Sequence, residues 1–280
     1  MSSILTNSSA LVALQTLKGI NSNLAKAQDE ISTGKKVANS QDNAAVWSIS
    51  KVMETDQNSF KTIQSNLNLA EAVVSTARNG ADQIYELLDE MKQLALGAGS
   101  DANDFSTVQA DIVAKKAQIT SVINASQMNG VNLLKTNPLP GATQFSVLGS
   151  LDRTSGTVAT AATSITVASV DFEADIDAAT ITPITNSTTA ATAIGQIEAL
   201  MNLAKEGSAK LGTAAKRIND QSTFVGKLAD SLKLGVSALV DADMEEASAR
   251  LQALQTQQQL GVQALSIANQ APQTILSLFR

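Results

Sequence analysis

A heptad repeat of apolar residues constrains this chain more than any other feature. Between residues 46 and 91, apolar side chains recur at alternating spacings of three and four, and only Asp56 interrupts them. Six heptads in one register predict a long coiled-coil helix, and Gly97 and Gly99 predict that it ends near Leu96. The residues of this predicted seam are Val46, Ile49, Met53, Phe60, Ile63, Leu67, Ala70, Val74, Ala77, Ala81, Ile84, Leu88 and Met91.

Four more segments carry helical patterns. One is predicted to start at Asp104 or Ser106 and carries Phe105, Val108, Ile112, Ile119 and Val122. A long one is predicted from about Ala190, with a seam that runs from Ile197 to Leu239. The two chain ends repeat the pattern from Ala10 to Ile31 and from Met244 to Ala268, where Gln258 and Gly261 interrupt it. Because small and polar residues lie on these end seams, each end helix needs a partner.

The segment between the long helices has a different pattern. Residues 128–131, Met-Asn-Gly-Val, indicate a turn, and residues 143–148 alternate as a strand does. Residues 153–195 are rich in Thr, Ala and Ser, with β-branched patches at 164–170 and 180–185. We therefore expect a mainly α protein, a long coiled-coil helical rod formed by both chain ends, with a small β-rich insertion in the middle.

Composition excludes several kinds of chemistry. The 280 residues include no cysteine and no histidine, which removes disulfides, thiol nucleophiles, Cys/His zinc sites and histidine bases. The formal charge of −6 disfavours nucleic acid as a partner. No apolar run is long enough to span a membrane, and the first 19 residues do not resemble a signal peptide. We expect no cofactor, no metal and no enzymatic activity.

Three polar motifs and one aromatic residue favour structural roles. Residues 32–36, Ser-Thr-Gly-Lys-Lys, lack the first glycine and the final Ser/Thr of a phosphate loop, and are typical of a helix C-terminus. Residues 241–246 hold four carboxylates that suit the first turn of a helix better than a cation site. The acidic residues alternating over 171–177 predict a loop or an edge strand protected by charge. Trp47, the only tryptophan, is predicted to be a packing residue.

Two motifs at opposite ends of the chain resemble a known family, the bacterial flagellins, and specifically the short flagellins of alphaproteobacteria. The N-terminal match runs from Leu24 through Ile31-Ser32-Thr33-Gly34, Val37-Ala38 and Asp42-Asn43-Ala44-Ala45 to Trp47-Ser48-Ile49. The C-terminal match comprises residues 241–247, residues 268–272 and the final Ile275-Leu276-Ser277-Leu278-Phe279-Arg280. Residues 128–134 also match, whereas residues 153–195 do not.

The resemblance implies a subunit that is exported and polymerises into the flagellar filament for swimming motility. It implies a terminal coiled-coil domain (1–41 and 241–280), a rod domain with a β-hairpin (42–149 and 190–240) and a variable surface insertion (150–189). Implied partners are other copies of the chain, the flagellar type III export apparatus, an export chaperone, and the filament cap and hook-junction proteins. The implied location is extracellular, after export without a cleaved signal peptide. A hook–filament junction protein and a secreted coiled-coil effector or adhesin are the alternatives.

Within this framework the end seams become the expected polymerisation interface. Its residues are Leu17, Ile20, Leu24, Ile31, Met244, Leu251, Leu254, Leu265, Ile275 and Leu276. The end helices are expected to be disordered in the monomer and to order against neighbours. Because residues 156–192 lack heptads, we expect that segment to contribute no stability to the rod. Glu90 stands where flagellins sensed by the animal Toll-like receptor carry an arginine, and this implies an altered receptor contact.

Overall fold

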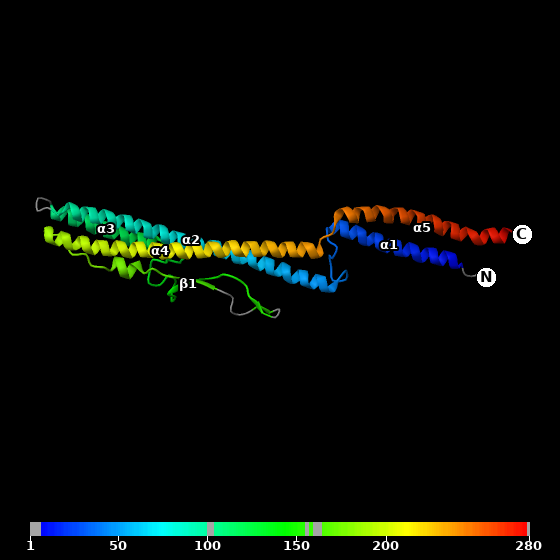
Figure 1. Cartoon of the computed structure of the whole chain (residues 1–280), viewed down its shortest axis with the longest axis horizontal. Coiled ribbons are helices and arrows are strands. Elements are labelled where there is room, and N and C mark those ends of the chain that lie inside the picture. Colours follow the sequence, from blue (N-terminus) through cyan, green and yellow to red (C-terminus); the bar gives the residue numbers. More distant parts are fainter. Residues whose placement is uncertain (1–6, 100–103, 155–156, 159–163, 279–280) are drawn as a thin grey trace. The chain divides into compact units, whose positions relative to one another are not determined.

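The protein is mainly α-helical, as predicted. The computed structural model describes residues 7–99, 104–154, 157–158 and 164–278. Over these residues the helices are α1 (Ser8–Thr33), α2 (Ala44–Gly97), α3 (Phe105–Ala125), α4 (Ser187–Val240) and α5 (Met244–Leu278) (Figure 1). The strands are β1 (Gln144–Leu148), β2 (Arg153–Thr154), β3 (Thr157–Val158) and β4 (Ser164–Ala168), and η1 (Glu173–Asp177) is a π-helical turn. The chain forms two compact units, which we call the terminal unit (1–56 and 231–280) and the rod unit (57–230).

The predicted seam of α2 is the core of the rod unit. Every seam residue from Phe60 to Met91 is buried, and most are completely shielded from solvent. On α4, Ile197, Leu200, Ala204, Leu211, Ile218 and Val225 are buried at the predicted spacing. The seam prediction is confirmed for the rod unit, because a 3.6-residue period with apolar residues on one stripe leaves a helix only one face to bury.

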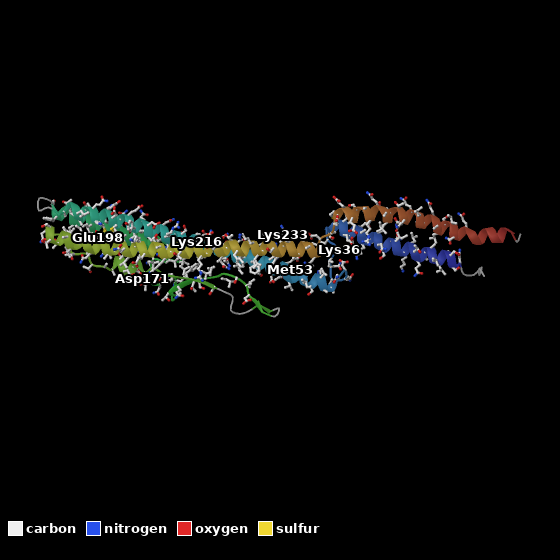
Figure 2. All side chains as sticks on the ribbon, in the orientation of Figure 1. Lys36, Met53, Asp171, Glu198, Lys216 and Lys233 are labelled. Carbon is white, nitrogen blue, oxygen red and sulfur yellow. The ribbon has the colours of Figure 1, made fainter. Side chains whose placement is uncertain are left out.

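Polar side chains beside the seam hold α2 and α4 antiparallel. The hydroxyl of Ser222 donates to Asn68 Oδ1 at 2.7 Å, and Asn219 Nδ2 donates to Glu71 Oε1 at 3.1 Å. Further along, Lys92 Nζ lies 2.7 Å from an oxygen of Glu198, which is labelled in Figure 2. Each contact joins residues whose numbers sum to 290, so all three indicate a single register.

The start of α3 and the turn after it follow the sequence signals. The carboxylate of Asp104 accepts hydrogen bonds from the backbone N–H groups of Ser106 and Thr107 at 3.0 and 3.3 Å, which is an N-cap. The hydrogen bond from the Thr107 hydroxyl, together with these two backbone bonds, lowers the pKa of Asp104. Beyond α3, Asn129 and Gly130 have φ angles of 52° and 78°, the signature of a type I′ turn.

The middle segment forms a β-hairpin-like sheet and contributes to the core. Strand β1 pairs antiparallel with β4, so that Val147 lies opposite Ile165. Strands β2 and β3 form a second antiparallel pair. Val147, Ile165 and Val167 are buried, so one face of the first pair packs inward. Residues 144–148 and the first β-branched patch are strands, as predicted.

The expectation that residues 156–192 contribute nothing to the rod is wrong. Phe172, Ile176 and Ile184 are each at most 2% exposed. Phe172 packs against the bare backbone of Gly207 on α4, where an added Cβ would lie 2.4 Å from Phe172 Cζ. The segment lacks heptads because it covers the rod from the side instead of extending the coiled coil.

One local expectation in this segment is also wrong, and another is wrong in part. Residues 180–185 form no strand, because side chains satisfy their backbone: Ile184 N donates to Gln109 Oε1 at 2.8 Å and Thr182 N to Gln196 Oε1 at 2.7 Å. Of the alternating acids at 171–177, Asp171 lies in a loop, as expected, whereas Glu173, Asp175 and Asp177 lie on the π-helical turn η1. Asp171, labelled in Figure 2, accepts from the Thr136 hydroxyl at 2.6 Å.

The ends of the two long seams differ from the prediction. Ile49 on α2 is 54% exposed and Leu239 on α4 is 40% exposed. Trp47 and Met53 are only half-buried. The predicted seam therefore holds from Phe60 onward, and it is open in the terminal unit.

Candidate functional site

The terminal unit pairs the two ends of the chain. Helices α1 and α5 run antiparallel and side by side (Figure 1). Asn7 caps α1 by accepting from Ala10 N at 3.1 Å, and its Nδ2 donates to the carbonyl of Ala268 at 2.7 Å. At mid-length Gln258 Nε2 donates to Asn21 Oδ1 at 2.7 Å. The residue after α1 is therefore close to the start of α5, and the first turn of α1 is close to the far part of α5.

Short backbone links fix that pairing at the connector end. Helix α1 ends at Gly34, whose φ of 68° is the left-handed conformation that glycine adopts readily. The N–H of Lys36 donates to the carbonyl of Val240 at 2.7 Å, and the N–H of Ala242 donates to the carbonyl of Gly34 at 3.0 Å. Residues 32–36 are thus a helix end and its connector, as expected.

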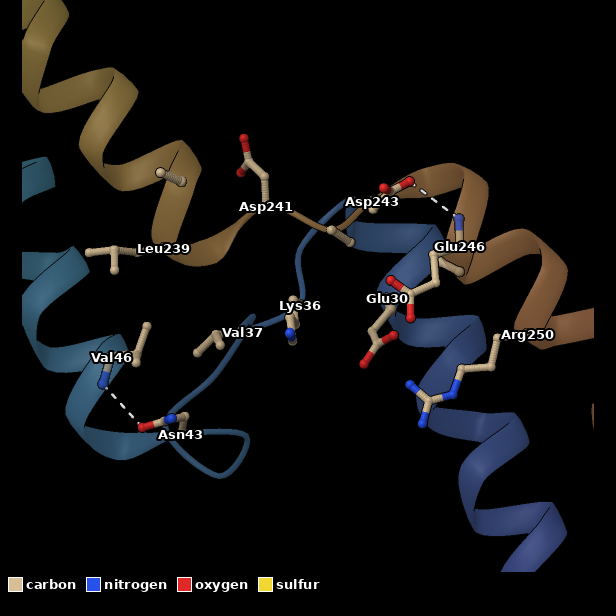
Figure 3. A pocket seen from close by; sticks show the side chains of 13 residues that line it. Glu30, Lys36, Val37, Asn43, Val46, Leu239, Asp241, Asp243, Glu246 and Arg250 are labelled. Atoms are coloured by element: carbon tan, nitrogen blue, oxygen red, sulfur yellow. Dashed lines mark hydrogen bonds between the residues drawn. The ribbon is translucent and has the colours of Figure 1, made fainter.

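The acidic run at 241–246 begins α5, as expected. Asp243 is the N-cap, since its Oδ1 accepts from the backbone N–H groups of Glu245 and Glu246 at 3.0 and 3.2 Å. Figure 3 shows the second of these bonds. Both glutamates lie in the first turn, where the helix dipole favours negative charge. Among the residues that the structure describes, no group of acids is arranged to hold a metal ion.

A polar hollow of about 420 Å³ lies beside these connectors. Its lining combines Glu30, Lys36, Asn43, Asp243 and Arg250 with apolar groups (Figure 3). Asn43 accepts from the backbone N–H of Val46 at 3.1 Å and so caps α2. Two of the polar side chains in the hollow, Asn43 and Asp243, therefore cap helices, and the hollow is part of the connector structure.

Of the ten predicted interface residues, eight have described side chains, and of these only Leu254 is buried. Leu17, Ile20, Leu24 and Ile31 of α1 are half-buried. On α5, Leu254 is buried, Leu251 and Leu265 are half-buried, and Met244 is 43% exposed. Ile275 and Leu276 belong to α5, but their side chains lie outside the described part of the structure. An added Cβ at Gly261 would lie 3.1 Å from Leu17 Cδ1, so the α5 backbone approaches α1 closely.

A second apolar set in the same helix pair was not predicted. Leu11, Val12 and Leu14 on α1 are 53–64% exposed, and Leu260, Val262 and Ile267 on α5 are 53–68% exposed. The bonds from Asn7 to Ala268 and from Gln258 to Asn21 place both trios in the same half of the pair. Residues 1–17 and 251–279 also contain no charged side chain, which is a signal that the sequence offers beside the heptads. An uncharged apolar surface of this kind marks an interaction site.

Glu90 lies on α2 in the rod unit. Its side chain is about half exposed and forms an ion pair with Lys115 of α3. The nearby Lys92 is bonded to Glu198, and this hydrogen bond raises the pKa of Lys92. The acidic side chain at position 90 is therefore fixed by a neighbouring helix.

Comparisons with known proteins agree with this arrangement. Residues 4–138 match the family model described as the bacterial flagellin N-terminal helical region, and residues 194–279 match the bacterial flagellin C-terminal helical region. The chain is 40% identical to a flagellin of Brucella melitensis, with all of both chains covered. It is 38% identical to flagellin FljM of Caulobacter vibrioides and 35% identical to flagellin C of Rhizobium meliloti, covering all of this chain and 99% and 100% of those relatives.

Proposed function

Because this chain belongs to the bacterial flagellin family, we propose that the exposed apolar surface of α1 and α5 is where its subunits bind one another. The chain is a structural subunit of the flagellar filament, which is extracellular and serves motility. Full-length similarity to flagellins does not favour the hook–filament junction protein or the secreted effector. The proposed surface comprises the half-buried seam together with Leu11, Val12, Leu14, Leu260, Val262 and Ile267.

The observation that carries this proposal is the exposure of large apolar side chains where the chain has no charge. Burying one leucine or isoleucine contributes roughly 1.5–3 kcal/mol. Six such residues, all more than half exposed in the single chain, give a neighbour enough apolar surface to bind. The half-buried seam adds to this, since Leu17 and Leu265 still have exposed surface to lose.

We also propose, from membership of the family, the export route and partners of the chain, the bounds of its domains and a purely structural role. The chain leaves the cell through the flagellar type III export apparatus without a cleaved signal peptide, and an export chaperone, the filament cap and hook-junction proteins are its other partners. The terminal domain comprises 1–41 and 241–280, the rod domain 42–149 and 190–240, and the variable segment 150–189. In support, the two family models leave residues 139–193 unmatched. The role of the chain is structural and involves no catalysis.

The experiment that tests the assembly surface compares paired variants in a polymerisation assay. Removing residues 1–31 and 244–280 is expected to leave a soluble helical monomer, because the rod unit has its own core. Leu260→Lys with Ile267→Lys in the full chain is expected to prevent polymerisation, since both side chains are already exposed and the fold loses nothing. Val113→Lys, on an equally exposed site of α3, is the matched control and should polymerise normally. Long filaments from the truncated chain would show that the surface is misassigned.

A further inference from the structure

The chain contains two Asn-Gly dipeptides, Asn79-Gly80 and Asn129-Gly130, and they lie in different backbone structures. In this dipeptide the asparagine side chain is most open to attack by the backbone nitrogen that follows it, because glycine has no Cβ to hinder the approach. Both asparagine side chains are exposed to solvent. The chemical fate of each asparagine therefore depends on whether the backbone nitrogen of its glycine is free.

The backbone nitrogen of Gly130 is free and reaches solvent. In the turn after α3, the N–H of Met128 donates to the carbonyl of Val131 at 2.9 Å, and the N–H of Val131 donates to the carbonyl of Met128 at 3.0 Å. Within the described structure the Gly130 N–H donates no hydrogen bond. Gly130 also lines an open, partly polar hollow of about 430 Å³. Water therefore reaches both this nitrogen and the side chain of Asn129.

The backbone nitrogen of Gly80 is held inside α2. Gly80 lies in the middle of this helix, where each backbone N–H bonds to the carbonyl four residues earlier. An added Cβ at Gly80 would lie 2.1 Å from Ser126 Oγ and 3.0 Å from Leu134 Cδ1, so the helix is closely covered at this point. Freeing this nitrogen requires α2 to unwind within the core, whereas opening the turn breaks only the two bonds between Met128 and Val131.

We propose that Asn129 is a site of spontaneous deamidation. When the turn opens, the Gly130 nitrogen attacks Asn129 Cγ, so that an N–Cγ bond forms and the Cγ–Nδ2 bond breaks. The Nδ2 group leaves as ammonia with the proton of the Gly130 N–H, and a cyclic imide remains. Water then opens the imide: addition at Cγ gives aspartate, and addition at the backbone carbonyl gives isoaspartate, whose main chain runs through Cγ. The co-reactant is water, and nothing is oxidised or reduced.

Isoaspartate at this position perturbs a buried part of the rod unit. It adds one atom to the backbone between Met128 and Val131, whose paired hydrogen bonds close the turn. Just beyond the turn, Leu134 is completely buried, and Asn132 Nδ2 donates to the carbonyl of Ile123 in α3 at 2.7 Å. We therefore expect the isoaspartate form to unfold at a lower urea concentration than the unmodified chain. Aspartate keeps the normal backbone and tolerates a positive φ, so it should cause no comparable loss.

Ageing of the purified full-length chain tests the proposal. The chain is incubated in mildly alkaline buffer and digested with trypsin, and isoaspartate is detected by methylation with a protein isoaspartyl methyltransferase and located by mass spectrometry. Cleavage after Arg78, Lys92, Lys116 and Lys135 places the two dipeptides in separate peptides. In the folded chain we expect isoaspartate to accumulate at position 129 at least about tenfold faster than at position 79. In urea the two sites should react at similar rates, because the dipeptide is the same.

Two variants serve as controls. Asn129→Gly removes the side-chain amide and keeps a residue that suits the turn, so no isoaspartate should form there. Asn129→Asp carries the charge of the product without the extra backbone atom, and it should unfold at the same urea concentration as the fresh natural chain. Equal rates at positions 129 and 79 in the folded chain, or no isoaspartate at 129 until the chain is unfolded, would overturn the proposal. The readout involves no filament, so it is independent of the proposed polymerisation.

Discussion

Gly207 offers the sharpest test of how the middle segment packs on the rod. An added Cβ at this position would lie 2.4 Å from Val170 Cγ1 and 2.4 Å from Phe172 Cζ. Real Cβ contacts are longer than 3 Å, so Gly207→Ala must displace Phe172, which is only 1% exposed. We expect this variant to destabilise the rod unit although alanine is the better helix former.

Two opposing effects set the magnitude. Replacing glycine by alanine inside a helix stabilises by about 1 kcal/mol. Overpacking a well-filled core costs about 1–3 kcal/mol. Gly212, also on α4, has nothing within 4 Å of an added Cβ. Gly212→Ala should therefore show only the stabilisation that comes from the higher helix propensity of alanine. The difference in unfolding free energy between the two variants then isolates the clash at about 1–3 kcal/mol.

Urea unfolding of the monomer, followed by circular dichroism at 222 nm, measures both variants. In thermal unfolding each kcal/mol corresponds to about 2–4 °C for a unit of this size. Adding Phe172→Leu to Gly207→Ala should recover part of the loss, because the shorter side chain leaves room for the methyl group. If Gly207→Ala stabilises as much as Gly212→Ala, Phe172 does not pack on α4 and the account of the middle segment is wrong.

Three further outcomes are expected. Gly130→Ala should cost about 1 kcal/mol in urea unfolding, because alanine is strained at a φ of 78°. The pKa of Glu54 is lowered from its ordinary 4.5, chiefly by the hydrogen bond from Lys51. The ionised Glu54 side chain therefore adds to the free energy of unfolding above pH 4.5, and this stabilisation is lost as the pH falls through the lowered pKa. Glu54→Gln should be less stable than the natural chain at pH 7, by about 0.3 kcal/mol, and equal to it near pH 2. Purified monomer should activate the animal Toll-like receptor less than a flagellin with arginine at the equivalent of position 90, and Glu90→Arg should raise its potency in a reporter assay; equal potency without the substitution would contradict this.

The parts of the fold that sequence predicted are those set by local periodicity and local caps. The burial from Phe60 to Met91 follows from one heptad register, and Asp104 caps α3 with its own neighbours. The Asn129–Gly130 turn needs only two residues that tolerate positive φ. In each case the residues that determine the structure lie within a few positions of one another.

The parts that sequence missed depend on partners far along the chain. Residues 180–185 are β-branched, yet Gln109 and Gln196 bind their backbone and no strand forms. Phe172 is buried because Gly207 leaves a space on another helix. A glycine inside a helix usually only lowers the stability of that helix slightly. That Gly207 makes room for an aromatic side chain can therefore be recognised only when the residue that faces it is known.

The end helices show why a heptad alone is a poor guide to an assembly surface. The seams of α1 and α2 follow the same spacing, yet Leu67 and Ile84 are fully buried while Leu17 and Ile20 stay half-buried. The difference lies off the seam: residues 57–97 contain eight charged side chains, whereas residues 1–17 and 251–279 contain none. Charged residues keep the outer face of a helix in water, so their presence predicts that residues 57–97 of α2 bury their seam within the chain. Their absence leaves apolar and uncharged polar side chains on the outer faces of α1 and α5, and exposed apolar patches of this kind are typical of interaction sites.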